Sequence, residues 1–172
     1  MSVAKEQQKT KPKIDEVVEN ILHGENLISV LAFIAFIKES KISLRWASQN
    51  CWHLYFKGTR IGNIRMTDKY RKNYALPDNS WAFSPWGSED VLESLVEHNS
   101  EAKEVVWNNI RLCSNCCNCG PGQNRIVFDK AFENTCHGWL RMLNPDKETL
   151  KFIKMMLRKK AEKLSNASNR EN

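Results

Sequence analysis

The sequence predicts a single α+β domain, in which helices cover a small antiparallel β-sheet beside a cysteine-rich loop. The hydrophobic pattern is helical near both ends of the chain but alternates with a period of two between Arg45 and Thr67. The 172 residues are 41% hydrophobic and 27% charged, a balance that excludes a disordered or fibrous protein. Four of the six cysteines fall within the seven positions from Cys113 to Cys119, which mark the loop.

Both ends of the chain are polar. We expect residues 1–13 to form a disordered basic arm, because MSVAKEQQKTKPK contains four lysines and few apolar side chains. This segment also lacks the apolar core and small-residue cleavage site of a secretory signal, so we expect a cytoplasmic protein. Residues 165–172, SNASNREN, are expected to be a disordered tail. The folded domain should therefore span residues 14–164.

Two helices are predicted before the alternating region. The segment IDEVVENIL, Ile14–Leu22, indicates a short amphipathic helix stopped by Gly24. The next helix, Glu25–Glu39, is almost entirely apolar and should be enclosed on most sides. Its apolar run from Leu27 to Ile37 has eleven residues, against the roughly twenty that span a bilayer, so we expect no membrane segment.

The alternating region predicts a β-hairpin. Alternation places Trp52, Leu54 and Phe56 on one face of the first strand. A three-residue loop, Gly58–Arg60, keeps the apolar side chains of both strands on that face, whereas a two-residue loop would place polar residues opposite them. The predicted pairs are Phe56 with Gly62, Leu54 with Ile64, and Trp52 with Met66.

The other face of the hairpin carries polar side chains, with His53 and Tyr55 expected to meet Asn63 and Arg65 across the two strands. Polar groups that converge beside aromatic rings are what a small-molecule site needs. A solvent-exposed outer face that binds no ligand explains the same pattern with fewer assumptions. Both interpretations stay open from the sequence alone.

The second half of the chain alternates between strands and helices. The segment SWAFSPW, Ser80–Trp86, predicts a third strand, and Ser88 is suited to cap the helix that follows. Another helix should begin near Ser100 and end at the cysteine-rich loop, after which RIVF favours a strand. Asn144, followed by Pro145, is the predicted N-cap of a terminal helix with one apolar stripe.

The cysteine-rich loop predicts a metal site. Cys116 and Cys119 are separated by two residues and followed by Gly120, which is the spacing of a metal knuckle. A closed tetrahedral site needs two more ligands, which an earlier and a later cysteine can supply. We therefore predict zinc bound by Cys113, Cys116, Cys119 and Cys136, with Cys117 or His137 as substitutes.

Three other interpretations of the cysteines stay open. An iron–sulfur cluster also uses C-x2-C-x2-C with a remote fourth cysteine, although Gly120-Pro121-Gly122 follows the third cysteine here. Cys136 and His137 would supply a thiol and a base, and so a metal- or thiol-dependent enzyme. Free cysteines are often buried small hydrophobic residues, which is our interpretation of Cys51.

The formal net charge of +6 raises the question of nucleic-acid binding. The positive charge is concentrated at the ends, since residues 1–13 carry a net +3 and residues 145–172 a net +4, which leaves −1 for residues 14–144. A nearly neutral centre argues against a dedicated phosphate-binding face. We therefore expect nucleic-acid binding to be weak or absent.

Four segments resemble a group of small uncharacterised bacterial proteins that have a cysteine-rich loop, a late cysteine and a closing NPD helix. They are WASQNCWHLYFKGTRIGNIRM, CNCGPG, FENTCH and NPDKETLKFIK, within residues 46–159. The resemblance implies a bacterial cytosolic setting and assigns no activity, cofactor or catalytic residue. The expected function is a binding or regulatory module with a structural zinc site, in preference to a catalyst.

Overall fold

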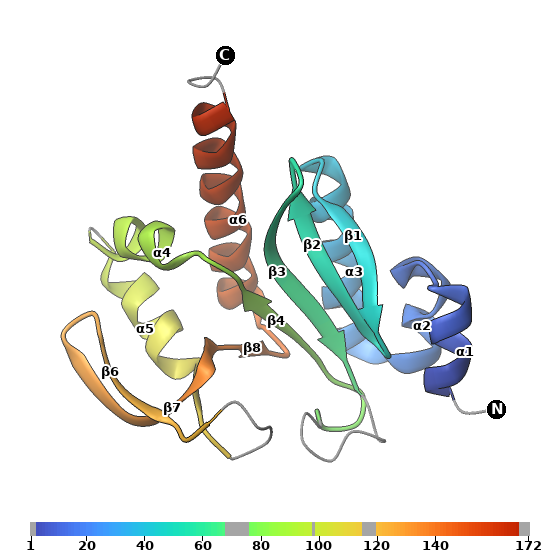
Figure 1. Ribbon diagram of the computed structural model, residues 1–172, viewed down its shortest axis with the longest axis horizontal. Coiled ribbons are helices and arrows are strands. Elements are labelled where there is room, and N and C mark those ends of the chain that lie inside the picture. Colours follow the sequence, from blue (N-terminus) through green and yellow to red (C-terminus); the bar gives the residue numbers. More distant parts are fainter. Residues whose placement is uncertain (1–2, 68–75, 98, 115–119, 169–172) are drawn as a thin grey trace.

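The computed structural model of the chain confirms the α+β class (Figure 1). It describes residues 3–67, 76–97, 99–114 and 120–168. A five-stranded antiparallel sheet has the order β1-β2-β3-β4-β8, and a three-stranded antiparallel sheet has the order β5-β7-β6. The elements are α1 (Val3–Thr10), η1 (Ile14–Glu16), α2 (Val18–Ile21), α3 (Gly24–Glu39), β1 (Ser43–Ser48), β2 (Cys51–Phe56), β3 (Thr59–Met66), β4 (Trp81–Pro85), α4 (Glu89–Val96), α5 (Ser100–Asn108), β5 (Ile110–Leu112), β6 (Gln123–Val127), β7 (Lys130–Leu140), β8 (Met142–Leu143) and α6 (Lys147–Ser168).

The main core lies between the five-stranded sheet and helix α3, which runs behind the sheet in Figure 1. The ring of Phe33 from α3 stacks on Trp81 with 5.5 Å between centroids and meets the edge of Phe83 at 5.6 Å. All three side chains are fully buried. The nearly all-apolar segment forms the predicted helix and packs Val30, Phe33, Ile34, Phe36 and Ile37 into the core. It is not enclosed on most sides as predicted, because Ile28 and Leu31 are 61% and 37% exposed.

The predicted β-hairpin is formed by β2 and β3, but its predicted register is wrong. Trp52 pairs with Ile64 and Leu54 with Gly62, a shift of two residues from the predicted pairs. A β-bulge between Leu54 and Tyr55 shifts the register by one residue, since Tyr55 pairs with Arg60 but Leu54 pairs with Gly62. Because the side-chain period of a strand is two, a shift of two residues leaves the side chains of β3 on their predicted faces.

The hairpin turn is also one residue shorter than predicted. Phe56 pairs with Thr59, which leaves Lys57 and Gly58 as the two turn residues. Their φ angles are +46° and +82°, and a tight hairpin turn with the right-handed twist of the strands requires both to be positive. Glycine adopts this conformation without the steric cost that other residues carry.

The two ends of the chain are more ordered than the sequence suggests. Residues 3–10, expected in a disordered arm, form α1, and Gln7 is only 6% exposed. The Gln7 amide donates to Asn50 Oδ1 at 2.8 Å and accepts from the Asn50 backbone N–H at 2.9 Å. At the other end, α6 continues to Ser168 through part of the expected tail.

Helix α6 begins two residues later than predicted. The Asp146 side chain accepts from the Thr149 backbone N–H at 2.8 Å, so Asp146 caps the helix. The predicted cap, Asn144, instead accepts from the Trp81 backbone N–H through its side chain and donates its own N–H to the Trp81 carbonyl. Asn144 therefore extends the pairing of β4 and fixes the entry to α6.

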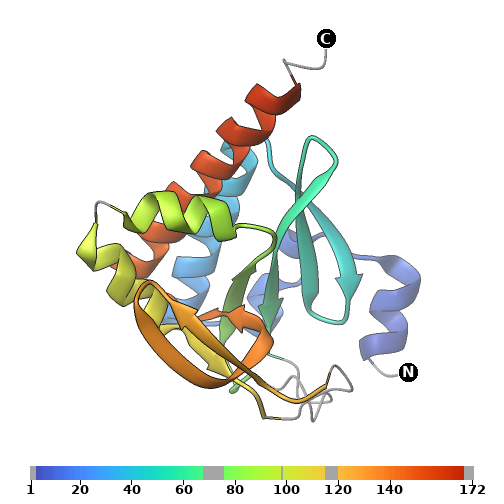
Figure 2. The same cartoon turned by 60° about the vertical axis from the view of Figure 1, so that its left-hand side comes forward.

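The three-stranded sheet forms a second layer. Figure 2 brings its orange hairpin, β6 and β7, forward from the green strands of the main sheet. The two sheets are linked through the end of β7, since Leu140 pairs with Ile110 of β5 and Met142 pairs with Phe83 of β4. Within the described part of the chain, no helix combines the length and the apolar character needed to cross a membrane.

Candidate functional site

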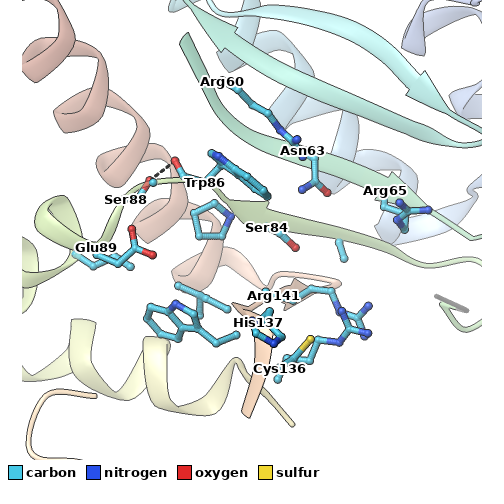
Figure 3. A pocket seen from close by; sticks show the side chains of 18 residues that line it. Arg60, Asn63, Arg65, Ser84, Trp86, Ser88, Glu89, Cys136, His137 and Arg141 are labelled. Atoms are coloured by element: carbon cyan, nitrogen blue, oxygen red, sulfur yellow. Dashed lines mark hydrogen bonds between the residues drawn. The ribbon is translucent and has the colours of Figure 1, made fainter. Parts of the chain in front are cut away.

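A cleft of about 760 Å³ opens between the two sheets (Figure 3). One wall is made by β3, β4 and the turn that leads into α4, and the other by β7 with residues of β5 and the β7–β8 link. Figure 3 shows Asn63 and Ser84 on the first wall and Cys136 and His137 on the second. The antiparallel pairing of Asn63 with Ser84 places these two side chains on the same face of the sheet.

Four arginines line the cleft and come from three places in the fold. Arg60 and Arg65 lie on β3, Arg111 on β5 and Arg141 between β7 and β8. Of the described residues that line the cleft, Glu89 alone is acidic. The guanidinium groups carry their charge at every physiological pH and bind carboxylate or phosphate in a bidentate manner. In a partly enclosed site their attraction for an anion exceeds that in bulk water.

Trp86 lines the cleft and is 54% exposed. Its backbone N–H donates to the Ile61 carbonyl at 3.0 Å, which places its ring next to β3. The Arg60 guanidinium lies 4.2 Å from the centroid of that ring. The next residue, Gly87, has a φ of +55° and lets the chain turn from β4 into α4. A stacked arginine–tryptophan pair offers a flat, positively charged surface to an aromatic or anionic group.

The Arg60 side chain has an unsatisfied donor. Its Nε–H is buried and meets no hydrogen-bond acceptor among the described residues. A buried donor without a partner costs about 1–3 kcal/mol. An acceptor oxygen on a bound ligand would remove that cost.

The pKa of His53 is affected by the positive charges beside the cleft. His53 lies on β2, where its direct neighbours across the strands are Arg45 and Asn63. Burial lowers the pKa of His53 below its ordinary value, and the charges of Arg60 and Arg65 lower it further. The imidazole therefore resists protonation as long as no negative charge is nearby.

The small-molecule interpretation of this hairpin face named four residues. Two of them, Asn63 and Arg65, line the cleft. The other two, His53 and Tyr55, lie on the adjacent strand β2, where Tyr55 pairs with Arg60 and His53 with Asn63. Arg65 pairs with Cys51 instead of His53, because the register differs from the predicted one.

The predicted zinc ligands are only partly described. Cys116 and Cys119, and the substitute Cys117, lie outside the described residues. Cys113 is half-buried and Cys136 is buried. In the described ranges, no three His, Cys, Asp or Glu side chains are grouped to hold a metal ion. The buried Cys51 confirms the interpretation of that residue as a core side chain.

The two ends of the cysteine-rich loop lie against β7. The Cys113 backbone N–H donates to the Asn134 carbonyl at 2.7 Å, two residues before Cys136. At the other end, a Cβ atom placed on Gly120 would lie 3.8 Å from His137 Nε2. The fold thus brings the loop ends to the strand that carries Cys136 and His137.

A second groove, of about 740 Å³, has the opposite charge. It lies between α1, α2 and the residues before β4. Glu6, Glu16 and Asp78 line it, and no lysine or arginine is among its described lining residues. An anion is therefore repelled from this groove and attracted to the cleft between the sheets.

Sequence reasoning missed Arg60, Trp86, Arg111 and Arg141 as site residues. The last two are far from β3 along the chain, and only the fold brings them to the cleft. One signal was present, since residues 40–67 contain five lysines or arginines and no aspartate or glutamate. Comparison of the chain with models of protein families, with curated proteins and with solved structures finds no match.

Proposed function

We propose that this protein is a cytoplasmic binding module whose cleft takes an organic anion with a phosphate or carboxylate group. The convergence of Arg60, Arg65, Arg111 and Arg141 on one cleft carries this proposal. A guanidinium group binds a carboxylate or phosphate through two parallel hydrogen bonds, so several of them at one cleft favour an anionic ligand. The exposed Trp86 ring and the unsatisfied Arg60 Nε–H add an apolar surface and a donor for the same ligand.

Isothermal titration calorimetry with thymidine 5′-monophosphate and with uncharged thymidine tests this proposal. The monophosphate should bind and the nucleoside should not. Arg60→Gln and Arg111→Gln should each weaken binding about tenfold or more, because a hydrogen bond to a charged group is worth about 1.5–3 kcal/mol. Lys151→Gln removes one positive charge from an exposed side chain of α6 and is the matched control.

The proposal fails if thymidine binds as well as its monophosphate, or if Lys151→Gln weakens binding as much as the two cleft variants. If a panel of phosphates and carboxylates shows no binding at all, the cleft is not an anion site. Turnover of a bound phosphate or ester that is lost in Cys136→Ser would instead favour the thiol-dependent enzyme.

We also propose that the cysteine-rich loop binds a structural zinc ion through Cys113, Cys116, Cys119 and Cys136, with Cys117 or His137 as substitutes. The support comes from the described ends of the loop, which both lie against the strand of Cys136 and His137. Such a site would fix the wall of the cleft that β7 forms. Thiolates are the ligands that zinc prefers in closed tetrahedral sites.

Elemental analysis of the purified protein tests the zinc proposal. The protein should contain about one zinc ion per chain, since a structural zinc site binds one ion. Its absorption spectrum should show no band in the visible range, because zinc is colourless. Cys119→Ser and Cys136→Ser should lose the metal, while Cys51→Ser should keep it. Iron with sulfide and a brown colour would identify the iron–sulfur alternative, and a folded protein without metal would refute both.

A further inference from the structure

The face of β1–β4 that is turned away from α3 is half-open to solvent, and we call it the open face. In Figure 1 the described helices of the domain lie behind or beside β1, β2 and β3, not in front of them. One row of paired residues crosses all four strands and ends at the cleft. The side chains of the open face that matter here are Arg45, His53, Tyr55, Arg60, Asn63, Arg65 and Ser84.

Positive charge is segregated to this face. Strands β1–β4 contain three arginines and one histidine but no aspartate or glutamate. Helices α4 and α5 alone contain five acidic residues. The near-neutral centre of the sequence is therefore the sum of a basic face and acidic helices. Net charge along the chain hides this distribution, which decides what the surface attracts.

Two arginine–aromatic pairs stand at the two ends of the open face. At the outer edge, the Arg45 guanidinium of β1 lies 4.5 Å from the centroid of the Tyr55 ring. At the cleft, Arg60 covers Trp86 at 4.2 Å. The His53 ring lies 6.4 Å from Tyr55 on the same strand, and Tyr55 pairs with Arg60 across β2 and β3. Aromatic rings next to cationic groups on a sheet surface are what unpaired bases and their phosphates bind.

The open face is wider than one nucleotide. Strands lie about 4.8 Å apart, so β1–β4 span about 14 Å. A stacked strand of nucleic acid carries one phosphate per about 3.4 Å, so this width admits at most about four nucleotides, and fewer when the bases are spread over the protein surface. The cleft adds Arg111 and Arg141 beyond β4. A single small anion would occupy the cleft and leave the Arg45–Tyr55 pair unused.

We propose that the ligand is single-stranded nucleic acid, which lies across the open face and places one end in the cleft. This inference rests on the proposed function, because the cleft is part of the same surface. A duplex fits less well, since its bases are stacked on each other and do not reach Tyr55 or Trp86. An acidic peptide would use the arginines but not the aromatic rings. The inference replaces the weak or absent nucleic-acid binding that net charge suggests.

Fluorescence anisotropy with a labelled twelve-nucleotide oligothymidylate tests the inference on the full-length protein. The oligonucleotide should bind tighter than thymidine 5′-monophosphate, and its affinity should fall with salt. The Arg45→Ala/Tyr55→Ala variant should weaken oligonucleotide binding about tenfold or more, because loss of one stacked base costs about 1–3 kcal/mol. Its affinity for the monophosphate should not change, since neither residue lines the cleft. Arg45→Gln alone, a milder change, should lower the slope of log K against log salt by about 0.7.

The outcomes separate this inference from the proposed function. If the oligonucleotide binds no tighter than the monophosphate, or if the double variant binds it as the native protein does, the inference is wrong and the anion cleft stands. If a DNA duplex or poly-glutamate binds as tightly as the oligothymidylate, the inference is also wrong. If neither oligonucleotide nor monophosphate binds, both proposals fall. Thermal melting of each variant shows whether it is folded.

Discussion

Phe33 joins helix α3 to the five-stranded sheet, so Phe33→Ala tests the packing that holds the domain together. The ring is fully buried and contacts Trp81 and Phe83 of β4 and Phe36 of its own helix. Truncation of a buried phenylalanine to alanine costs about 3–5 kcal/mol, because it removes apolar contacts and leaves a cavity. For a chain of this size that loss corresponds to a fall in melting temperature of about 6–20 °C.

Thermal melting followed by circular dichroism, with urea unfolding as a second probe, measures this effect. The matched control is Ile28→Ala on the same helix, because Ile28 is 61% exposed. That variant should change the free energy of unfolding by at most about 0.5 kcal/mol, as surface substitutions usually do. If Phe33→Ala costs no more than Ile28→Ala, the packing of α3 on the sheet is not as described.

Three further predictions concern local features. Gly62→Ala should destabilise the domain by about 1–3 kcal/mol, because a Cβ atom there would lie 2.8 Å from the Phe83 ring; an unchanged melting temperature would contradict this close approach. Asp146→Ala should cost about 1 kcal/mol in urea unfolding at pH 7 by removing the cap of α6. The hydrogen bond from the Thr149 N–H lowers the pKa of Asp146, so the contribution of the cap to the free energy of unfolding should be present above about pH 4 and disappear at lower pH. If Asp146→Ala lowers the free energy of unfolding equally at pH 2 and pH 7, this reasoning is contradicted. A bound anion should raise the lowered pKa of His53, so inorganic sulfate, whose charge does not change in this range, should bind more tightly at pH 5.5 than at pH 8. His53→Gln should flatten this dependence, and an unchanged profile in that variant would exclude His53 as its source.

The pKa of His53 also predicts how stability changes with pH. Because the folded state holds this pKa below the value of about 6.5 in the unfolded chain, the unfolded state binds more protons at slightly acidic pH. The free energy of unfolding should therefore fall as the pH drops below about 6.5. The other groups on the open face that act on His53 are arginines, which keep their charge throughout this range.

The fold class could be predicted from sequence because it depends on patterns within single segments. The apolar run of α3 predicts a helix, and the alternation in β2 and β3 predicts strands, whatever these segments pack against. The register of the hairpin could not be predicted, because the bulge at Leu54 and Tyr55 has no local signature. The sequence also does not predict that α1 is an ordered helix, because α1 is held by two hydrogen bonds between Gln7 and Asn50, which are 43 residues apart.

The candidate site was less predictable than the fold. Asn63 and Arg65 could be named from the alternation of one hairpin, because a strand places such residues on one face without help from the rest of the chain. Arg111 and Arg141 reach the cleft through the three-stranded sheet, whose position relative to β3 no sequence pattern encodes. Summed charge was misleading for a related reason, because it adds the acids of α4 and α5 to the arginines of the open face.

The most direct measurement of the central claim is a ¹H–¹⁵N NMR titration of the protein with thymidine 5′-monophosphate, followed at every assigned amide. Binding in the cleft predicts shifts confined to residues 60–65, 84–89, 111 and 136–141, and no shifts with thymidine at the same concentration. Shifts at the acidic groove beside α1, shifts spread over the lysines of α6, or no shifts at all would contradict the claim that the cleft between the two sheets is the anion site.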